Sequence, residues 1–507
     1  MLSTRRQSTS VAPSRGPVLL LMLLGALAIA TPRISDAMDL TTIDDEPLTL
    51  SGWIRFRDYT WSYFNAGPVP SAFGNDNQYN YPALVARLGI GYQLDGVKLF
   101  VEGMNPTFFG LPDDAIAPAP KGALGLGANY YSVRKESFDS SVFLKQGYVE
   151  FGGQILKDLA VKGGRFEFFD GKDLPVEDRQ IQWITDNRVA QRLIGNFGWS
   201  DVMRSFDGAQ VGYGGQNWRA LVFYGVPTRG VFDLNGMDEI SAVDVIYAAL
   251  SGFRTDGAWG NSLGRVFYIW YDDNRGLVPV DNEPASSAKK NLRSISIDTI
   301  GADFVHDVKL GPGTADFMVW GAYQFGNWGD QTQAAYAATA EAGYRFDDVP
   351  WTPWLRLGYD MASGDNNPNN GVHGTFFQIL PTPRIYALDP IYNMMNSTDV
   401  LGELIIFPTA DINLRTTLHG LWLSSNRDLW YYGGGAFDSH LFGYVGRPSL
   451  GNSYLGSVLD TSLTWNANRY LTFNLYGGHM FGGSVVAADF PNGREETFGY
   501  MEAVCQF

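Results

Sequence analysis

The sequence has little with which a large protein could be cross-linked or anchored in a membrane by helices. Its 507 residues include one cysteine, Cys505, so internal disulfide bonds are excluded. Beyond the N-terminal region, no stretch approaches the roughly 18 uninterrupted apolar residues of a membrane-spanning helix. The chain is therefore either soluble or crosses a membrane with β-strands, whose alternating residues keep the average hydropathy near zero.

Histidine and positive charge are also scarce. The five histidines lie in no recognisable nucleophile motif, and no Gly-x-Ser-x-Gly elbow is present, so the sequence does not indicate an enzyme. The formal net charge of −16 argues against a nucleic-acid partner, which would require a basic face. The acidity does not set the charge of a pore, because loops can carry the acid. The histidines are His306, His373, His419, His440 and His479.

The N-terminus has the three parts of a secretory signal peptide. Arg5, Arg6 and Arg15 precede an apolar run at 17–30, and Ser35 and Ala37 are small residues at the first and third of the three places before a cleavage site. We expect residues 1–37 to be a cleaved signal peptide and residues 38–507 to be a single exported domain. An uncleaved N-terminal anchor and an earlier cut after position 30 are the alternatives.

Apolar and polar residues alternate along many segments, which is typical of β-strands with two different faces. Within 84–92, leucine and isoleucine alternate with arginine and glycine, and four other segments repeat this pattern. In a sandwich the apolar face would point into a core, whereas in a membrane barrel it points to lipid and the polar face lines the lumen. Alternation alone does not separate these folds. The other segments are 355–362, 411–422, 459–466 and 471–475.

Length, aromatic content and the C-terminal residue favour the barrel. The mature length corresponds to about 18 strands (16–20) at roughly 25 residues per strand and connection. Aromatic residues make up 14% of the chain, which suits girdles at two membrane interfaces, and the chain ends in Phe507, as outer-membrane barrels typically do. The sequence thus predicts an all-β fold, a single antiparallel transmembrane β-barrel with long extracellular loops. Candidate long loops that could constrict the lumen are Asn65–Tyr81, Asn105–Asn129, Asp272–Lys290, Ser363–Pro383 and Gly433–Asn452.

Three segments resemble motifs of one family. The first contains Gly164-Arg165-Phe166, then Arg192-Leu-Ile-Gly with a nearby Trp199, and then Arg204-Ser-Phe-Asp207-Gly. The second, 357–376, has a Ser-Gly-Asp loop and a Thr-Phe pair, and the third is 455–460. In this order they resemble the bacterial alginate-export family of outer-membrane barrels. The resemblance covers part of the first half of the chain and most of the second.

This chain departs from the family pattern at four positions. Phe166 stands where Gln is usual, Gln210 replaces a second Arg, Gly198 replaces an Asp and Val458 replaces a Glu. Two of these changes remove polar or charged lumen candidates. The departures therefore bear on a polyuronate as the substrate more than on the fold, and the family includes members whose cargo is not alginate.

Arginine is the residue that a channel for anions needs. A ring of fixed positive charge attracts a polyanion, neighbouring carboxylates hold the geometry, and guanidinium groups form paired hydrogen bonds with carboxylates. Alternation puts four arginines on polar strand faces, and the resemblance implies two more that face the lumen. The alternative is that these are ordinary ion pairs that stiffen the barrel. The candidate channel-lining and selectivity residues are Arg55, Arg87, Arg165, Arg204, Asp207, Arg356, Asp360, Arg415 and Asp460.

The loop at 365–369 carries oxygen ligands at alternate positions, so Asp365, Asn367 and Asn369 form a candidate calcium loop. The glycine spacing does not fit an EF-hand, and turns rich in Asn and Asp are common. We expect no cofactor. The expected partners are outer-membrane lipid and the transported solute, with periplasmic secretion components as a further option.

These observations favour a passive outer-membrane channel for anionic, alginate-like polysaccharide or small anionic solutes. A general diffusion porin for nutrient uptake, with the same fold, is the alternative. An enzyme on a barrel and a soluble lectin-like β-protein are less consistent with the motifs. The sequence does not reveal the cargo, the direction of transport, the oligomeric state or the gating of the loops.

Overall fold

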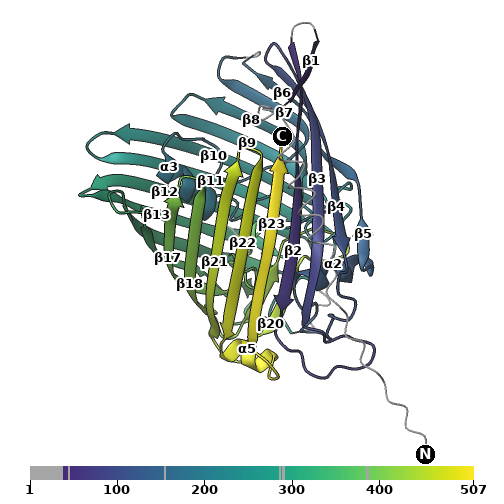
Figure 1. The fold of residues 1–507 in the computed structure, drawn as a ribbon. Coiled ribbons are helices and arrows are strands. Elements are labelled where there is room, and N and C mark those ends of the chain that lie inside the picture. Colours follow the sequence, from purple (N-terminus) through teal and green to yellow (C-terminus); the bar gives the residue numbers. More distant parts are fainter. Residues whose placement is uncertain (1–37, 44–45, 154–155, 285–286, 288–291, 384–387) are drawn as a thin grey trace, which may run out of the picture.

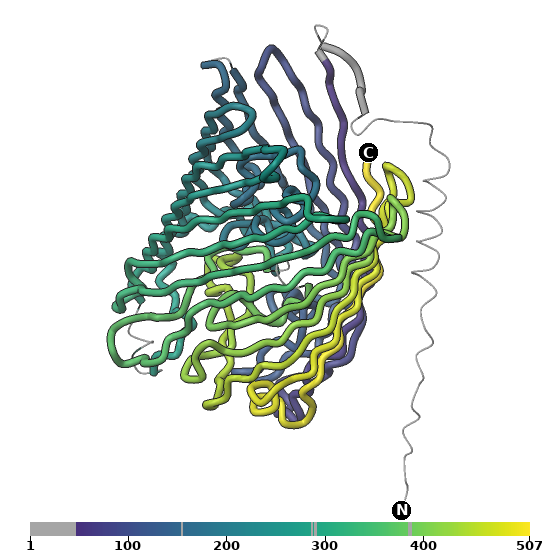
Figure 2. Tube along the Cα trace, turned by 90° about the vertical axis from the view of Figure 1, so that its left-hand side faces the viewer, coloured from purple at the N-terminus to yellow at the C-terminus, as the bar shows by residue number. Residues whose placement is uncertain are grey.

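The described residues form one closed antiparallel barrel of eighteen strands (Figures 1 and 2). The structure is a computed structural model that describes residues 38–43, 46–153, 156–284, 287, 292–383 and 388–507. The expected signal peptide, 1–37, lies outside the described residues. In order around the wall, the strands are β2 (Glu46–Ser62), β3 (Gln78–Leu94), β4 (Val97–Phe109), β6 (Phe143–Gly152), β7 (Leu159–Phe166), β8 (Phe206–Gly214), β9 (Trp218–Pro227), β10 (Val243–Asp256), β11 (Gly260–Asp273), β12 (Ile295–Leu310), β13 (Gly313–Trp328), β14 (Gln331–Phe346), β15 (Trp354–Ala362), β17 (Ser397–Thr409), β18 (Ile412–Trp422), β21 (Tyr454–Asn468), β22 (Leu471–Gly482) and β23 (Glu495–Gln506).

The barrel closes where its last strand pairs with its first. β23 pairs antiparallel with β2 from Trp53↔Gln506 to Ser62↔Thr497, and Phe507 exchanges two backbone hydrogen bonds with Gly52 at 3.0 and 2.9 Å. Closure leaves the wall without an open edge. The predicted all-β barrel of about 18 strands is confirmed. Smaller strands add to it: β1 (Met38–Ile43) on β2, β5 (Phe138–Ser140) on β4, β16 (Val372–His373) parallel to β14, and a separate hairpin of β19 (Leu429–Gly433) and β20 (Tyr444–Pro448).

The predicted alternation separates an apolar exterior from a polar interior. In β3, Leu88 is 53% exposed while the adjacent Arg87 is 7% exposed. In β15, Leu357 is 72% exposed and Arg356 is 1% exposed. Apolar side chains on the outer wall face lipid in a membrane barrel, while the polar face lines the lumen. Outward aromatic side chains lie near both ends of β13, as girdles require: these are Phe317, Tyr323 and Phe325.

Short and long connections occupy opposite ends of the barrel, here called the turn end and the loop end. At the turn end, the Asp95-Gly96 pair joins β3 to β4 with positive φ at both residues (35° and 77°), as a tight hairpin requires. The C-terminus lies at this end (Figure 1). At the loop end, most connections are long, and 329–330 between β13 and β14 is short. The longest loop-end connections are 110–142, 167–205, 363–396 and 423–453.

The predicted loops match these connections in part. The residues at 105–109 complete β4, and that loop continues to 142 rather than ending at 129. Residues 78–81 begin β3, and the loop at 423–453 starts ten residues before the predicted Gly433 and contains the β19–β20 hairpin. The connection 167–205 was not among the predicted loops, although the family motifs run through it.

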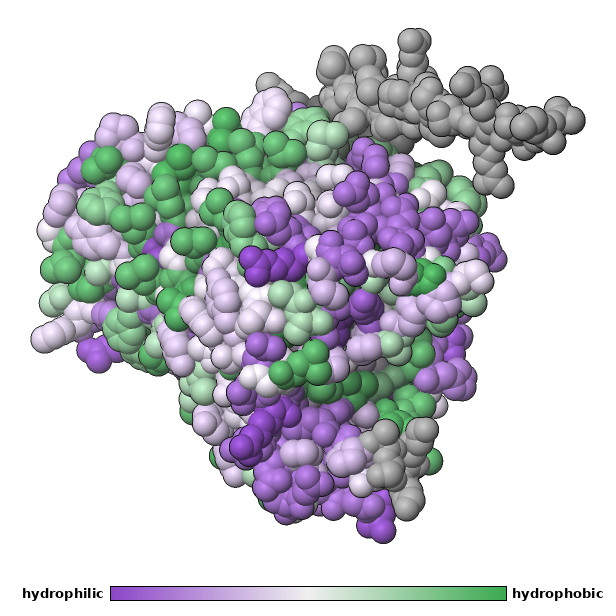
Figure 3. Space-filling model, turned by 90° about the horizontal axis from the view of Figure 1, so that it is seen from below, coloured by the Kyte–Doolittle hydropathy of each residue, from purple (hydrophilic) through white to green (hydrophobic). Residues whose placement is uncertain are grey.

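The long loops fold over and into the barrel, so that the interior is packed rather than empty. Figure 3 shows the loop end covered by side chains. In the described part of the loops lie four short helices: α2 (Leu126–Arg134), α3 (Arg179–Ile184), the π-helix η1 (Thr185–Val189) and α5 (Ser484–Asp489). Among the described residues, no helix has the length and apolar character needed to span a membrane.

Candidate functional site

A single connection, residues 167–205, enters the lumen and contacts several sectors of the wall; we call it the inserted loop. Its local structure starts at Asp178, whose carboxylate accepts hydrogen bonds from the backbone N–H groups of Gln180 and Ile181 at 2.9 Å and caps α3. The helix continues into η1, which brings Arg188 and Arg192 to the wall. The loop returns to the wall at Phe206, directly opposite Phe166 in the β7–β8 ladder.

Two arginines of the inserted loop pair with carboxylates of the wall. Arg188 donates from Nε to Glu341 of β14 at 2.7 Å, and Arg192 donates from Nη1 to Asp360 of β15 at 2.8 Å. Glu341 also accepts from Arg356, which donates a second bond to Asp316 at 2.5 Å. These groups are buried. Removing one charge from such a network is costly, because an opposite charge would stay buried with fewer partners.

Arginines of the opposite wall hold the far end of the inserted loop. Arg55 donates to the backbone oxygen of Ser200 at 2.6 Å and to Asp201 at 3.1 Å. Arg57 donates to the backbone oxygen of Trp199 at 2.6 Å and pairs with Glu502. Two predicted lumen arginines therefore differ in partner: Arg55 binds the inserted loop, whereas Arg415 pairs with the wall residue Glu403.

Two further ion-pair clusters tie the start of the inserted loop to the wall. Arg87 binds Glu102 of β4 and reaches Glu167 at 3.1 Å with both terminal nitrogens. Burial alone would raise the pKa of Glu167, but Lys145 and Arg87 lower it to about 2. Farther along, Arg265 of β11 lies 3.6 and 3.8 Å from the inserted-loop carboxylates Asp170 and Asp173. The loop is thus anchored on four sectors of the barrel.

A second loop, 363–396, meets the inserted loop inside the lumen. Gly195 donates its backbone N–H to Leu380 at 2.8 Å, Leu380 donates back to Leu193 at 2.8 Å, and Thr382 donates to Gln191 at 3.0 Å. The Thr382 hydroxyl adds hydrogen bonds with Phe197 and with the Gln191 side chain. This short parallel ladder joins the two loops into one partition across the barrel.

The predicted pair Arg165 and Asp207 lies away from the other candidates. The two side chains bond at 2.5 Å, but they lie on the face of β7 and β8 that carries the exposed Val211 and Tyr213. Their neighbours Phe166 and Phe206 point the other way, into a buried aromatic cluster with Phe223. Met237 accepts from Arg165 through its backbone oxygen. The outward position follows from strand pairing, because Arg165 pairs with Gly147 of the outer face.

Arg204 is buried in the inserted loop close to aromatic rings. It donates to the backbone oxygen of Gly434, and its guanidinium lies 6.0 Å from the Phe197 ring. Within the described residues, its Nε and Nη1 atoms have no hydrogen-bond partner. Burial lowers the pKa of Arg204 to about 10. Asp460, the last predicted carboxylate, is buried on the lumen face of β21.

On the turn-end side of the partition lies a polar cavity of about 520 Å³, here called the inner chamber. Lys172, on the inserted loop, and Arg415, on the wall, are its charged side chains, and Trp199 lies at its boundary. Lys172 pairs with Asp186 at 2.8 Å. Among the described residues that line the chamber, none is a carboxylate, and neutral donors complete it: Asn187, Gln191, Asn196, Thr382, Asn413, Ser462, Thr464 and Asn474.

The candidate calcium loop has side-chain oxygens that accept hydrogen bonds within the loop. Asp365 accepts from the backbone N–H of Asn367 at 2.8 Å, and Asn367 accepts from that of Asn369 at 3.3 Å, as successive Asx turns do. Within the described part of the chain, no three His, Cys, Asp or Glu residues are grouped as a metal site. Calcium binding here stays a prediction.

Sequence reasoning missed the anchors that lie on strands with weak alternation. Arg265 points inward with Phe267, and the outward Val266 lies between them, in a strand that is apolar on both faces. Glu341 and Glu403, by contrast, are single charges within the apolar segments 338–342 and 401–406, and this signal could have placed them on the lumen face. The anchors of the inserted loop itself carry no periodic signal.

Comparison with known proteins gives a consistent picture. A family model described as "Alginate export" matches residues 123–499. Among solved structures, the Pseudomonas aeruginosa outer-membrane protein OpdK, solved also with vanillate, is similar with a TM-score of 0.52 and 8% identity over 90% of this chain and 98% of that one. Acinetobacter baumannii OccAB1 has a TM-score of 0.51 and 10% identity over 94% and 100%. At such identity the likeness shows the barrel fold. A search of curated proteins found no match.

Proposed function

Because the chain belongs to the alginate export family of outer-membrane barrels, we propose that it is a passive channel for anionic solutes. The proposed cargo is an anionic, alginate-like polysaccharide or a smaller anion. The cargo needs neither covalent chemistry nor nucleotide to pass, because a barrel offers diffusion along its lumen. We propose further that the loop end faces outside and the turn end faces the periplasm.

The lining of the inner chamber is the observation that supports an anionic cargo. Lys172 and Arg415 face it together with eight amide and hydroxyl side chains, and the carboxylates that pair with the two cations are not among its described lining residues. A chamber walled by protein and lined by one sign of charge concentrates ions of the opposite sign. Neutral donors then replace part of the water around an anion.

The lumen arginines supply a second part of the proposal. Arg55 and Arg87 bind carboxylates of the inserted loop, and Arg356 binds carboxylates of the wall, so these arginines support the structure rather than stand free for a solute. Passage of a polymer would require the inserted loop to move, whereas a small anion could pass through a narrower opening. The structure thus favours small anions in the state described here.

Single-channel recording of purified protein in a planar bilayer tests the proposal. Under a salt gradient, we expect the reversal potential of the wild type to indicate anion preference. Lys172→Gln should reduce the anion-to-cation permeability ratio by about twofold or more, because it removes one of two chamber cations. Arg254→Gln is the matched control, since Arg254 is 76% exposed and lies on the outer face of β10. Cation preference in the wild type, or equal shifts in both variants, would overturn the anionic cargo.

A general diffusion porin is the alternative that this recording also addresses. Such a channel would pass neutral sugars and uronates at similar rates. For the proposed channel, alginate oligomers added to the bath should reduce the current, and a neutral oligosaccharide of equal length should not. Equal effects of the two would favour the general porin.

A further inference from the structure

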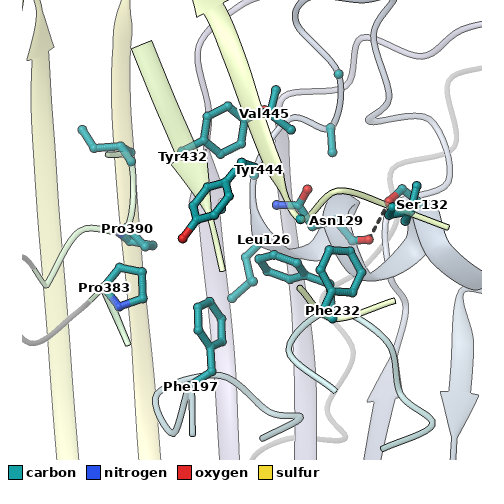
Figure 4. A pocket seen from close by; sticks show the side chains of 18 of the residues that line it. Leu126, Asn129, Ser132, Phe197, Phe232, Pro383, Pro390, Tyr432, Tyr444 and Val445 are labelled. Carbon is teal, nitrogen blue, oxygen red and sulfur yellow. Dashed lines mark hydrogen bonds between the residues drawn. The ribbon is translucent and has the colours of Figure 1, made fainter. Parts of the chain in front are cut away.

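A second cavity, of about 350 Å³, lies on the loop-end side of the partition; we call it the outer chamber. It is enclosed by α2, the tip of the inserted loop and the β19–β20 hairpin (Figure 4). Its chemistry differs from that of the inner chamber, because aromatic and aliphatic side chains make up most of its lining. The rings include those of Tyr63, Phe197, Trp199, Phe232, Tyr432 and Tyr444.

The tyrosines of the outer chamber have their hydroxyl groups occupied elsewhere. Arg447 donates to the hydroxyls of Tyr63 and Tyr432 at 3.0 and 2.9 Å, and the Tyr444 hydroxyl donates to the backbone oxygen of Gln378. Neither Arg447 nor Gln378 is part of the described lining. These interactions leave the chamber mainly with ring faces and edges, which suit an apolar occupant.

Among the described lining residues, Asn129 offers the one carboxamide. Asn129 of α2 lies at the chamber beside Ser132, whose hydroxyl donates to the Asn129 backbone oxygen at 2.7 Å (Figure 4). Among the described residues, the Asn129 carboxamide makes no hydrogen bond, and its side chain offers both donors and an acceptor. The chamber can therefore satisfy one or two polar atoms of a ligand, but not many.

The geometry points to a binding site for a compact ring compound, aromatic or alicyclic, that carries one polar substituent. The volume is ample for a ring compound, because a cavity of about 150 Å³ already holds benzene. Pockets of this size that are mostly apolar with a few polar groups are typical ligand sites. A sugar would bury several hydroxyl groups without partners, which is costly. The inference is independent of the charge preference proposed above, because Lys172 and Arg415 lie across Trp199 in the other chamber.

Trp199 lies between the two chambers. It lines both of them, and its backbone oxygen is held by Arg57 at 2.6 Å. Phe197 and Pro383 line the outer chamber, whereas the adjacent Gly198 and Thr382 line the inner one. The partition is thus one or two residues thick at this point, and a ring in the outer chamber would rest directly on it.

Isothermal titration of the intact barrel in detergent with p-cresol, a single ring with one hydroxyl group, tests the assignment. We expect saturable binding at one site per chain and no displacement by galacturonate. Ala123→Trp, which places a large side chain into the chamber lining, should weaken binding by tenfold or more. Ala209→Trp makes the same change on the exposed outer face of β8 and should leave the affinity unchanged.

A second variant guards against misfolding of the filled chamber. Asn129→Ala removes the polar anchor without adding volume, and it should weaken p-cresol binding several-fold while sparing that of toluene, which has no hydroxyl group. Equal p-cresol affinity in the wild type and in Ala123→Trp, or displacement by galacturonate, would overturn the assignment. Loss of anion preference alone would count against the channel proposal and leave this site standing.

Discussion

Most of the described buried arginines of this barrel pair with carboxylates, whereas Arg204 does not. Arg192 meets Asp360 at 2.8 Å, and Arg188 meets Glu341 at 2.7 Å. Arg204, buried to the same degree, has the Gly434 carbonyl as its hydrogen-bond acceptor among the described residues. An isolated buried charge costs stability unless it is hydrogen-bonded and paired.

We therefore predict that Arg204→Met is neutral or stabilising. The methionine fills similar space beside Phe197 and removes a desolvated charge. Arg192→Met, by contrast, would leave the buried Asp360 with Arg188 at 3.8 Å in place of Arg192 at 2.8 Å, and would cost up to about 3–5 kcal/mol. Thermal unfolding in detergent, followed by the change of electrophoretic mobility on heating, measures both variants. If Arg204→Met lowers the unfolding temperature as much as Arg192→Met does, Arg204 has a charged partner that matters.

Residue faces could be predicted from the sequence more readily than residue partners. Alternation placed Arg55, Arg87, Arg356 and Arg415 on the inner face, where the structure has them buried. It could not give Asp201 or Glu167 as partners, because these come from the inserted loop, where no periodic pattern exists. It also gave no guidance at Arg165, since the two glycines before it hide which face of β7 is apolar.

At the level of elements, the inserted loop is a plug on a wall that closes without it. β7 and β8 pair continuously from Leu159↔Tyr213 to Phe166↔Phe206, so the loop leaves and re-enters the wall at neighbouring positions. Its anchors reach β2, β3, β11, β14 and β15 through side chains rather than through backbone pairing. Strand count and loop positions follow from periodicity and composition, but a path through the lumen depends on contacts between distant segments.

Replacing residues 171–200 with a short Gly-Ser linker should leave the barrel folded and raise its conductance several-fold. The wall carboxylates and arginines that lose their partners would then face water rather than protein, so the cost of unpairing them is small. Recording in a planar bilayer compares the variant with wild type, and an equally long linker replacing residues in the loop 274–294 serves as the control. Unchanged conductance would mean that the inserted loop does not limit the passage.

At the level of the whole molecule, closure of the barrel depends on the pairing of β2 with β23, here called the seam. The seam joins β2 and β23: Ile54 of β2 lies directly opposite Cys505 of β23, and both side chains lie on the outer face, which also carries the exposed Met501. Residues directly opposed in an antiparallel pair have Cα atoms about 4.5–5.5 Å apart, within the range of a disulfide bond. The single cysteine of the sequence therefore marks one side of the closure.

Ile54→Cys should form a disulfide bond with Cys505 under mild oxidation, because closure alone brings these two positions together. The oxidised product would have no free thiol. After heat denaturation its electrophoretic mobility should differ from that of the reduced form, because the bond joins positions 54 and 505 and closes nearly the whole chain into a loop. Thr60→Cys, which pairs with Gly499 on the same seam, is the matched control and should keep both thiols. Free thiols in oxidised Ile54→Cys would mean that β2 and β23 are not neighbours in this register, and a barrel that stays open there could not separate a lumen from lipid.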